Sequence, residues 1–408
     1  MPRTLLALTA ALIAVPAVAK LVPGVSVPQV QVPPVNLPDV GRTVSGVTEP
    51  VGDTAARLLD LRTERIDRLL RRNRDSIELD AQGAPARRGE LLLIDPSPAA
   101  LAAAQAAGFA PGEREEMGSL GLAVVRVILP RGISLAEGEA RLRRTAPDAE
   151  IAADNLHFQS GGSALPVVQA ASVAAASIAA PVGIIDGAPG SGQAVSAMRG
   201  FARGAPTASN HGSAVASLLT AAGASNLRVA DIYGTDPAGG NALALVRALD
   251  WLIGGGAKVI SISLGGPNNA AVAKAIAAAQ RKGVVVVAAV GNDGPAAPPA
   301  YPASYPGVVA VTGVDGRSRA LIEAGRALHL DYAAPGADIS ARDSKGKWSR
   351  VRGTSYAVPL VAARAAAAIG RGENWRTALD REAEDLGARG ADAQYGRGLL
   401  CRGCARRS

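Results

Sequence analysis

Hydrophobic residues in the C-terminal half of the chain gather in short continuous runs, and longer amphipathic stretches separate these runs. The runs predict strands at residues 182–186, 227–232, 258–264, 284–290 and 308–311. The stretches predict helices at residues 212–222, 241–253, 270–282 and 358–369. Runs such as VVVVAAV show no polar alternation, as expected when helices cover both faces of a parallel sheet. We therefore predict a doubly wound α/β domain with a mostly parallel sheet over residues 181–400, whose active site lies beyond the carboxyl ends of the strands.

Residues 88–159 show a different alternation. Apolar runs at 91–94 and 122–129 predict strands, the stretches at 98–107 and 134–144 predict helices, and residues 151–158 close the unit. This order of elements predicts a small α+β domain in front of the α/β domain. Residues 160–180 are rich in Gly, Ser and Ala and predict a linker between the two.

The N-terminal region divides into three predicted segments. Residues 1–19 have a positive start, an apolar stretch and the small-residue ending Ala17-Val18-Ala19, which together are typical of a signal peptide; a buried helix is the alternative. Residues 20–52 are rich in Val and Pro and predict an extended linker. Residues 53–80 predict a basic helix that packs on the next domain or is solvated; a helix that lies on a membrane surface is the alternative. The chain is thus expected to be exported, to the periplasm or the extracellular space.

Composition narrows the class of partner. Charged residues make up 19% of the chain, too few for a protein that is disordered over most of its length. The net charge of +8 comes mainly from scattered arginines, and no basic run is interleaved with aromatic residues. This argues against nucleic acid as a partner. No apolar run is long and unbroken enough to predict a transmembrane segment.

Three polar residues stand at the ends of predicted elements, where an α/β sheet places its chemistry. Asp186 ends the strand VGIID, His211 opens a helix in NHGSAVASLL, and Ser355 precedes a helix in GTSYAVPLVAA. A serine hydroxyl becomes nucleophilic when an imidazole takes its proton, and the imidazole needs a carboxylate to orient it. The other histidines, His157 and His329, do not open a helix, so His211 is the candidate general base.

These segments, in the order Asp, His, Ser, resemble the signature segments of the subtilisin-like serine peptidases. KVISISLGGP at 258–267 is similar to the family's substrate-binding strand, and AAVGNDG at 288–294 to its oxyanion-hole segment. The resemblance implies a subtilisin-like fold for residues 181–400, with Asp186, His211 and Ser355 as catalytic residues and Asn292 in the oxyanion hole. It also implies that the substrate-binding cleft is walled by Ser263, Leu264, Gly265, Gly266, Ala288, Ala289 and Val290.

The segments depart from the family pattern at a few positions. Gly187 and Ala188 follow Asp186 where Ser or Thr and then Gly are usual, and Ala214 replaces the usual second histidine of its motif. Tyr356 stands where many relatives have methionine. None of these changes removes an atom of the candidate triad.

The resemblance implies a secreted serine endopeptidase that cleaves polypeptides through an acyl-enzyme. Residues 88–159 then correspond to a propeptide, with self-processing expected within 159–180 of the linker; a permanently attached accessory domain is the alternative. The partners would be polypeptide substrates and the chain's own propeptide. A catalytically silent subtilase used for binding or regulation is the competing function, although its usual hallmark is a lost triad or oxyanion residue. A lipase or esterase is not supported, because the chain has no Gly-x-Ser-x-Gly motif.

No cofactor or metal is expected to take part in the chemistry. The acidic residues form no loop typical of calcium binding, and a structural calcium ion stays open at this point. The basic tail at 401–408 carries the pair Cys401 and Cys404, which predicts a small disulfide or, second, free thiols. Zinc would need further ligands that the neighbouring sequence does not supply.

Overall fold

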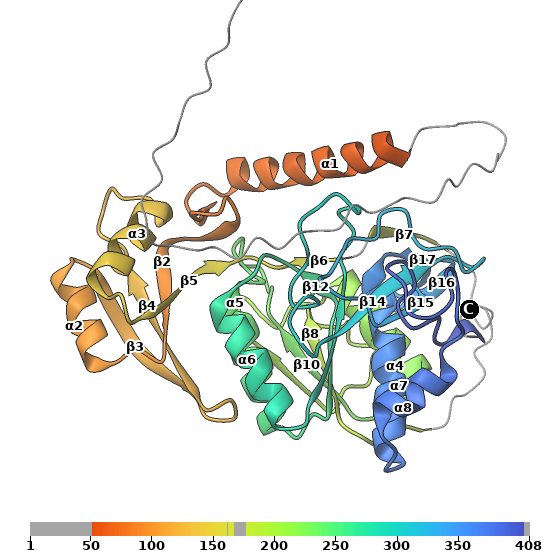
Figure 1. Ribbon diagram of the computed structural model, residues 1–408. Helices are drawn as coiled ribbons and strands as arrows, with labels where there is room; N and C mark the ends of the chain where they lie inside the picture. The colour runs from red at the N-terminus through yellow and green to blue at the C-terminus, as the bar shows by residue number, and fades with distance from the viewer. Residues whose placement is uncertain (1–50, 161, 167–176, 404–408) are drawn as a thin grey trace, which may run out of the picture. The chain divides into compact units, whose positions relative to one another are not determined.

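A computed structural model describes residues 51–160, 162–166 and 177–403 (Figure 1). The predicted signal peptide, almost all of the Val/Pro-rich linker, residues 161 and 167–176 of the second linker, and Cys404 lie outside the described residues. No helix in the described ranges has the length and apolar character needed to cross a bilayer.

The centre of the larger domain is a seven-stranded parallel sheet in the order β15-β14-β13-β11-β8-β10-β9. Five strands match the predicted runs: β8 (Val182–Asp186), β10 (Leu227–Asp231), β11 (Val259–Ile262), β13 (Val285–Ala289) and β14 (Val309–Val314). The edge strands β9 (Ala197–Gly200) and β15 (Tyr332–Pro335) were not predicted, because they are short and carry no long apolar run. The predicted α/β class with a parallel sheet is confirmed.

Helices cover both faces of this sheet. One face packs against α5 (Ala242–Gly254) and α6 (Ala270–Arg281), and the other against α4 (Asn210–Ala221) and α7 (Val358–Gly370). Strand β13 shows how the faces divide: Val286 and Ala288 belong to the first core, Val287 and Ala289 to the second. Successive side chains of a strand point to opposite faces, so a strand buried on both sides must be apolar at every position. A short helix, α8 (Trp375–Glu382), follows α7.

The smaller domain is an antiparallel sheet with two helices. Its elements are β1 (Ile77–Leu79), β2 (Pro85–Ile94), α2 (Pro98–Ala106), β3 (Ala110–Met117), β4 (Leu122–Ile128), α3 (Leu135–Thr145) and β5 (Glu150–Asn155). The α+β prediction was right in class but missed β3, whose sequence APGEREEM is mostly polar because the strand lies at an exposed edge. Helix α3 begins where predicted, since Ser134 and Glu137 form a capping box.

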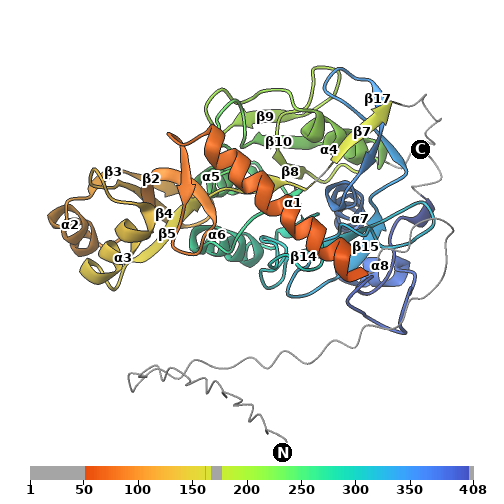
Figure 2. The ribbon, with the colours of Figure 1, turned by 90° about the horizontal axis from the view of Figure 1, so that it is seen from above.

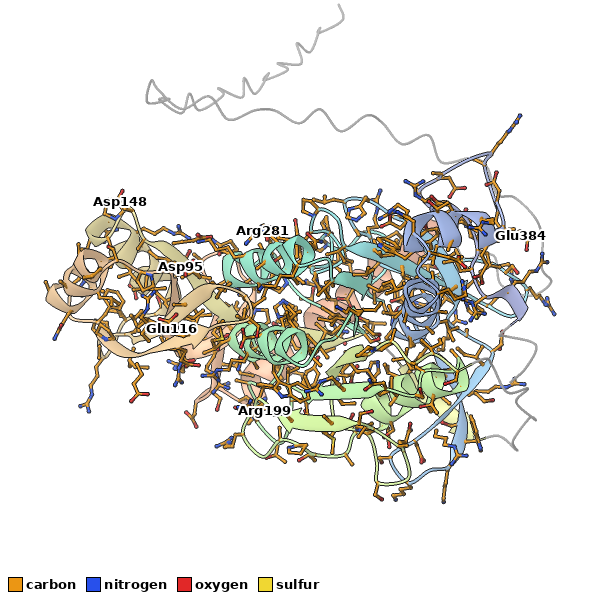
Figure 3. The ribbon with its side chains drawn as sticks, turned by 90° about the horizontal axis from the view of Figure 1, so that it is seen from below. Asp95, Glu116, Asp148, Arg199, Arg281 and Glu384 are labelled. Atoms are coloured by element: carbon orange, nitrogen blue, oxygen red, sulfur yellow. The ribbon has the colours of Figure 1, made fainter. Side chains whose placement is uncertain are left out.

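The sheet of the smaller domain is buried on both faces. Leu91 and Leu93 pack under α2 and α3, whereas Leu92 and Ile94 join the core formed with α5 and α6 of the larger domain. In Figure 3, seen from below, Asp95 lies at the edge of the small domain that faces α6, and its carboxylate is 3.4 Å from Lys274 Nζ. The two domains therefore share one hydrophobic core.

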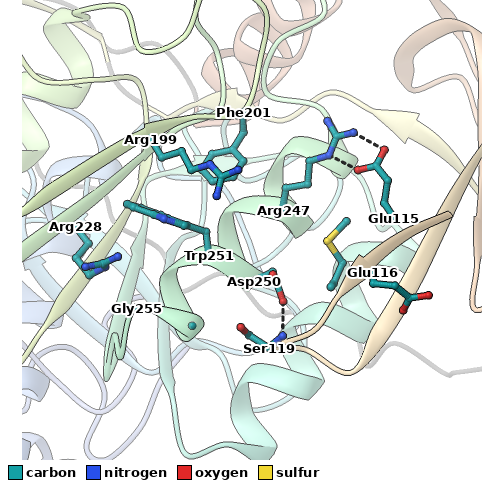
Figure 4. A pocket seen from close by; sticks show the side chains of 12 residues that line it. Glu115, Glu116, Ser119, Arg199, Phe201, Arg228, Arg247, Asp250, Trp251 and Gly255 are labelled. Atoms are coloured by element: carbon teal, nitrogen blue, oxygen red, sulfur yellow. Dashed lines mark hydrogen bonds and ion pairs between the residues drawn. The ribbon is translucent and has the colours of Figure 1, made fainter. Parts of the chain in front are cut away.

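Polar contacts surround this shared core. Glu115 accepts two hydrogen bonds from the Arg247 guanidinium, and Asp250 accepts from the backbone N–H groups of Ser119 and Leu120 at 2.7 and 3.1 Å. A cavity of about 520 Å³ lies between β3 and α5 (Figure 4), and Glu115, Arg247 and Asp250 are among the residues that line it. None of the candidate catalytic residues lines this cavity. The smaller domain is thus docked through both apolar and charged contacts.

Helix α1 (Val51–Arg72) precedes the smaller domain and ends earlier than the predicted basic helix at 53–80. Asn73 stops it: its side-chain amide donates to the Leu69 carbonyl, and its own carbonyl accepts from Ser76 and Ile77. The chain then turns into β1. An asparagine whose side chain satisfies a carbonyl of the last turn is a typical helix end.

The segment that follows the smaller domain forms two short strands, the second of them where a linker was predicted. Strand β6 (Phe158–Gln159) pairs antiparallel with β12 (Leu264–Gly265). Strand β7 (Gly162–Pro166) pairs antiparallel with β17 (Trp348–Arg352). β17 in turn pairs with β16 (Ile339–Arg342). The predicted linker at 160–180 therefore contains a strand. Backbone hydrogen bonds to β17 hold this strand, and the sequence of residues 162–166 shows no alternation that would predict it.

Candidate active site

Asp186, His211 and Ser355 come from three separate elements that meet at the carboxyl edge of the sheet. Asp186 is the last residue of β8, and His211 lies in the first turn of α4. Ser355 lies in a single 3₁₀ turn, η1 (Thr354–Tyr356), directly before α7. Asp186 and Ser355 are fully buried, and His211 is 8% exposed. This is the edge at which a doubly wound sheet carries its site.

The three side chains form a continuous chain of contacts. His211 Nδ1 lies 2.8 Å from Asp186 Oδ2 and 3.0 Å from Oδ1. His211 Nε2 lies 3.0 Å from Ser355 Oγ. With Nδ1 carrying the proton toward the carboxylate, Nε2 is free to accept from the serine hydroxyl. The order carboxylate, imidazole, hydroxyl is the one required to activate a serine.

Two glycines allow the end of β8 to touch the start of α4. A β-carbon on Gly187 would lie 2.4 Å from Ser209 Oγ, and one on Gly212 would lie 2.0 Å from the Gly187 carbonyl oxygen. The Gly187 N–H also donates to Asp186 Oδ1 at 2.7 Å. A side chain at position 187, where the family pattern has Ser or Thr, would therefore have to displace the Ser209 side chain in the present chain. Ser209 caps α4 by accepting from Gly212 N–H.

Asn292 and the backbone of Ser355 direct donors at one point. The Asn292 side-chain amide donates to the carbonyl oxygen of Ser160, and the Ser355 N–H donates to the same oxygen at 3.3 Å. The Asn292 side-chain oxygen accepts from Thr354 N–H at 3.0 Å, which aims the amide nitrogen at Ser160. Two convergent donors beside a nucleophile are the arrangement that stabilises a tetrahedral oxyanion.

Residues 158–160 occupy the cleft in front of Ser355. Ser160 N–H donates to the Ser263 carbonyl at 3.2 Å, which extends the antiparallel pairing of β6 with β12. Ser355 Oγ lies 2.6 Å from the Ser160 carbonyl oxygen. Gln159 Nε2 donates to Asp186 Oδ1 at 2.8 Å. Sequence reasoning did not foresee the position of Ser160 or the contact of Gln159, because the two residues lie far from β12 and Asp186 along the chain.

The residues predicted to wall the cleft separate into two groups. Ser263, Leu264 and Gly265 lie along the strand that pairs with residues 158–160, and Ser263 Oγ also donates to the Ser355 carbonyl at 2.9 Å. Gly266 continues this strand by pairing with Tyr301. By contrast, the side chains of Ala288, Ala289 and Val290 are buried in the two cores of the sheet. They position the turn leading to Asn292.

Ala300 is a cleft residue that the sequence motifs did not single out. A β-carbon on Gly265 would lie 3.4 Å from the Ala300 β-carbon and 3.6 Å from Ser160 Oγ, and one on Gly291 would lie 3.6 Å from the Ala300 β-carbon. Ala300 thus stands beside both Gly265 and Gly291. Its N–H is held by the Arg326 carbonyl at 2.8 Å.

Two features complete the electrostatic surroundings. The Tyr356 ring packs 5.3 Å from the His211 ring, and burial together with the Asp186 carboxylate raises the Tyr356 pKa, so its hydroxyl stays neutral.

Within residues 51–160, 162–166 and 177–403, no group of three or more His, Cys, Asp or Glu side chains is arranged to hold a metal ion. Cys401 is disulfide-bonded, and Cys404 lies outside the described residues.

Comparison with known families decides how this site is classified. The model of the subtilase family, Peptidase_S8, matches residues 198–398, a range that contains His211, Asn292 and Ser355. The chain carries a subtilase-family domain. Asp186 precedes the matched range, so its assignment rests on the geometry described above.

Curated relatives agree with the subtilase assignment. A subtilisin from Bacillus pumilus is 32% identical over 162 residues, which are 38% of this chain and 59% of that protein. A thermophilic serine proteinase from Bacillus sp. strain AK1 is 34% identical over 202 residues, 46% of this chain and 50% of its own length. The aligned part thus spans between half and three fifths of each relative.

A solved structure extends the likeness in fold beyond the subtilase domain. The crystal structure of fervidolysin from Fervidobacterium pennivorans, a keratinolytic enzyme related to subtilisin, matches with a TM-score of 0.64 at 18% identity. The match covers 79% of this chain and 61% of that one. Since 79% is more than the subtilase domain alone, part of the preceding region shares the arrangement.

Proposed function

We propose that this protein is a serine endopeptidase made as a zymogen, and that it cuts its own chain after Ser160. The observation that carries the proposal is the placement of the Ser160 carbonyl. Its oxygen lies 2.6 Å from Ser355 Oγ and accepts from both Asn292 and the Ser355 N–H. The residues before it lie antiparallel to β12, as an extended substrate would.

The proposed chemistry uses only side chains of the subtilase domain. His211 takes the proton of the Ser355 hydroxyl as Oγ bonds to the Ser160 carbonyl carbon. The bond to the nitrogen of Gly161 then breaks, and His211 returns the proton to that nitrogen. Water, deprotonated in turn by His211, releases Ser160 as a carboxylate and restores the hydroxyl. No cofactor or metal enters these steps.

The occupied cleft also supports a preference at the cleaved position. Ser160 is 6% exposed, and a β-carbon on Gly265 would lie 3.6 Å from its Oγ and 3.4 Å from the Ala300 β-carbon. Because Ser160 is buried against this wall, a larger side chain would have little room here. We therefore propose small residues, such as Ser, Ala and Gly, on the amino side of the bond that is cut in other polypeptides.

Export to the periplasm or the extracellular space belongs to the same proposal. It is supported by the sequence of residues 1–19 and by the likeness to subtilisins, one of whose relatives is described as a minor extracellular protease of Bacillus subtilis. The proposed partners are polypeptide substrates and the chain's own residues 51–160.

The function is tested with a fluorophosphonate probe, which bonds covalently to an activated serine. The matured wild-type protein should be labelled, and a Ser355→Ala chain should not. A His211→Ala chain should label far more slowly, because its serine has lost the general base. Equal labelling of wild type and Ser355→Ala would overturn the assignment.

The oxyanion donor provides a graded prediction. Asn292→Ala should lower kcat for a peptide substrate by about 10²–10³-fold, the size found for the corresponding donor in subtilisin. KM should change little, because the lost hydrogen bond strengthens only as charge develops on the oxygen. A change confined to KM would contradict this role for Asn292.

A further inference from the structure

Helix α1 lies across the subtilase domain, as Figure 2 shows from above. Ion pairs join it to the loop that carries Asn292. Arg62 Nε lies 3.2 Å from Asp293 Oδ2, and the Arg65 guanidinium donates to both oxygens of the same carboxylate at 2.9 and 3.1 Å. Asp293 is the residue directly after Asn292. The helix thus contacts the neighbour of the oxyanion donor.

An apolar contact adjoins these ion pairs. A β-carbon on Gly294 would lie 2.9 Å from the Leu58 side chain, so Leu58 rests directly on this loop. Toward the end of the helix, Leu69 packs against a small core that contains Leu156, and Phe158 packs against the same core. Leu58, Arg62, Arg65 and Leu69 are spaced four, three and four residues apart, the spacing of one face of a helix.

Arg65 also touches the segment that fills the cleft. The guanidinium carbon of Arg65 lies 5.6 Å from the centre of the Phe158 ring, and the same guanidinium pairs with Asp293. Phe158 is in β6, directly before Gln159 and Ser160. One side chain therefore joins α1, the oxyanion loop and the strand bound in the cleft.

We propose that α1 is a second inhibitory element, distinct from the α+β domain, that holds residues 158–160 in the cleft after the bond following Ser160 has been cut. The inference rests on the proposed function. Cutting one bond leaves every contact of α1 intact, so the cleaved segment stays bound until α1 detaches. The pairs with Asp293 are partly exposed, with side-chain exposure of 30% for Arg62, 49% for Arg65 and 28% for Asp293. Salt therefore weakens them.

The experiment measures two times in the full chain: when the cut after Ser160 occurs, by mass spectrometry, and when activity on a chromogenic peptide begins. The variant is Arg62→Ala with Arg65→Ala. Its control is Arg68→Ala with Arg71→Ala, two exposed arginines of the same helix for which no ion pair is observed. Both double variants lose the same charge and the same helix-forming residue type.

The Arg62/Arg65 variant should cut itself at the control's rate, which also shows that it folds. Its delay between cutting and activity should shorten about fivefold relative to the control, as expected when two partly exposed ion pairs are lost. Raising the salt concentration should shorten the delay of the control by a larger factor than that of the variant, which keeps the ion pairs of the smaller domain but not those with Asp293. Equal delays in both double variants would overturn the proposal.

A charge exchange gives a second, independent readout. Arg62→Asp with Arg65→Asp should shorten the delay, and the further change Asp293→Arg should restore much of it, because an arginine at 293 would then face two carboxylates. Absence of this rescue, with cutting still observed, would count against α1 as an inhibitory element. Absence of cutting in the wild type would instead overturn the proposed function, so the two failures are distinguishable.

Discussion

A Ser355→Ala chain should accumulate uncut, whereas the wild type should yield a fragment that begins at Gly161. Removing the hydroxyl leaves no atom to attack the Ser160 carbonyl, even though Asn292 and the Ser355 N–H still hold its oxygen. The expected loss in the cutting rate is on the order of 10⁶-fold, the size measured for removal of the nucleophile in subtilisin. N-terminal sequencing and intact mass of both chains, expressed alike, provide the measurement.

A matched variant tests whether the position of the cut is set by the cleft. Ser160→Phe retains all catalytic candidates but places a large side chain at a position that is only 6% exposed, so its self-cleavage should slow strongly. Ser160→Ala should cut at a rate close to that of the wild type. A new N-terminus at Gly161 in the Ser355→Ala chain would mean that another protease makes the cut.

Asp186→Asn should lower kcat by about 10⁴-fold with the fold retained. The side chain of asparagine is neutral and lacks the carboxylate that accepts a hydrogen bond from His211 Nδ1–H. The imidazole therefore loses both its fixed orientation and the negative charge that stabilises its protonated form. The loss should appear in kcat with little change in KM, since Asp186 does not hold the scissile bond. Circular dichroism of the variant checks that the fold is unchanged.

Asp231 is the matched control for Asp186. It ends the adjacent strand β10 in register with Asp186 and is equally buried, but its carboxylate accepts from the backbone of Thr207, Tyr233 and Gly234 instead of from an imidazole. Asp231→Asn should lower thermal stability and leave kcat of the folded fraction nearly unchanged. A larger loss of kcat in Asp231→Asn than in Asp186→Asn would contradict the role given to Asp186.

The central strands could be predicted because each lies between two helical layers. β8 and β13 have no solvent-exposed side, so their sequences are continuous apolar runs that little else produces. The residues at the ends of those runs, such as Asp186, could then be ranked by the rule that parallel sheets carry their chemistry at the carboxyl edge. For His211 and Ser355, residue type and the following helical pattern agreed with that rule.

The remaining features depend on contacts between residues distant in sequence. β3 is an edge strand that reads as a polar loop, and residues 158–160 are too short to show any periodicity. The pairing of Ser160 with β12 and of Arg65 with Asp293 comes from the docking of whole domains. Ala300 stands in no motif, and its importance follows from a distance to Gly265 that only the folded chain defines.

The Ser160 carbonyl has a consequence for how the first turnover ends. Before the cut, a neutral amide oxygen faces the Asn292 amide and the Ser355 N–H. After hydrolysis the same position carries a carboxylate, and hydrogen bonds to an ionised acceptor are roughly twice as strong as those to a neutral one. The reaction therefore converts a reactant into a tighter ligand of the same donors. In the proposed self-cleavage, a polypeptide that competes for the cleft would therefore have to displace an anion held by charge-assisted hydrogen bonds, and not a neutral peptide.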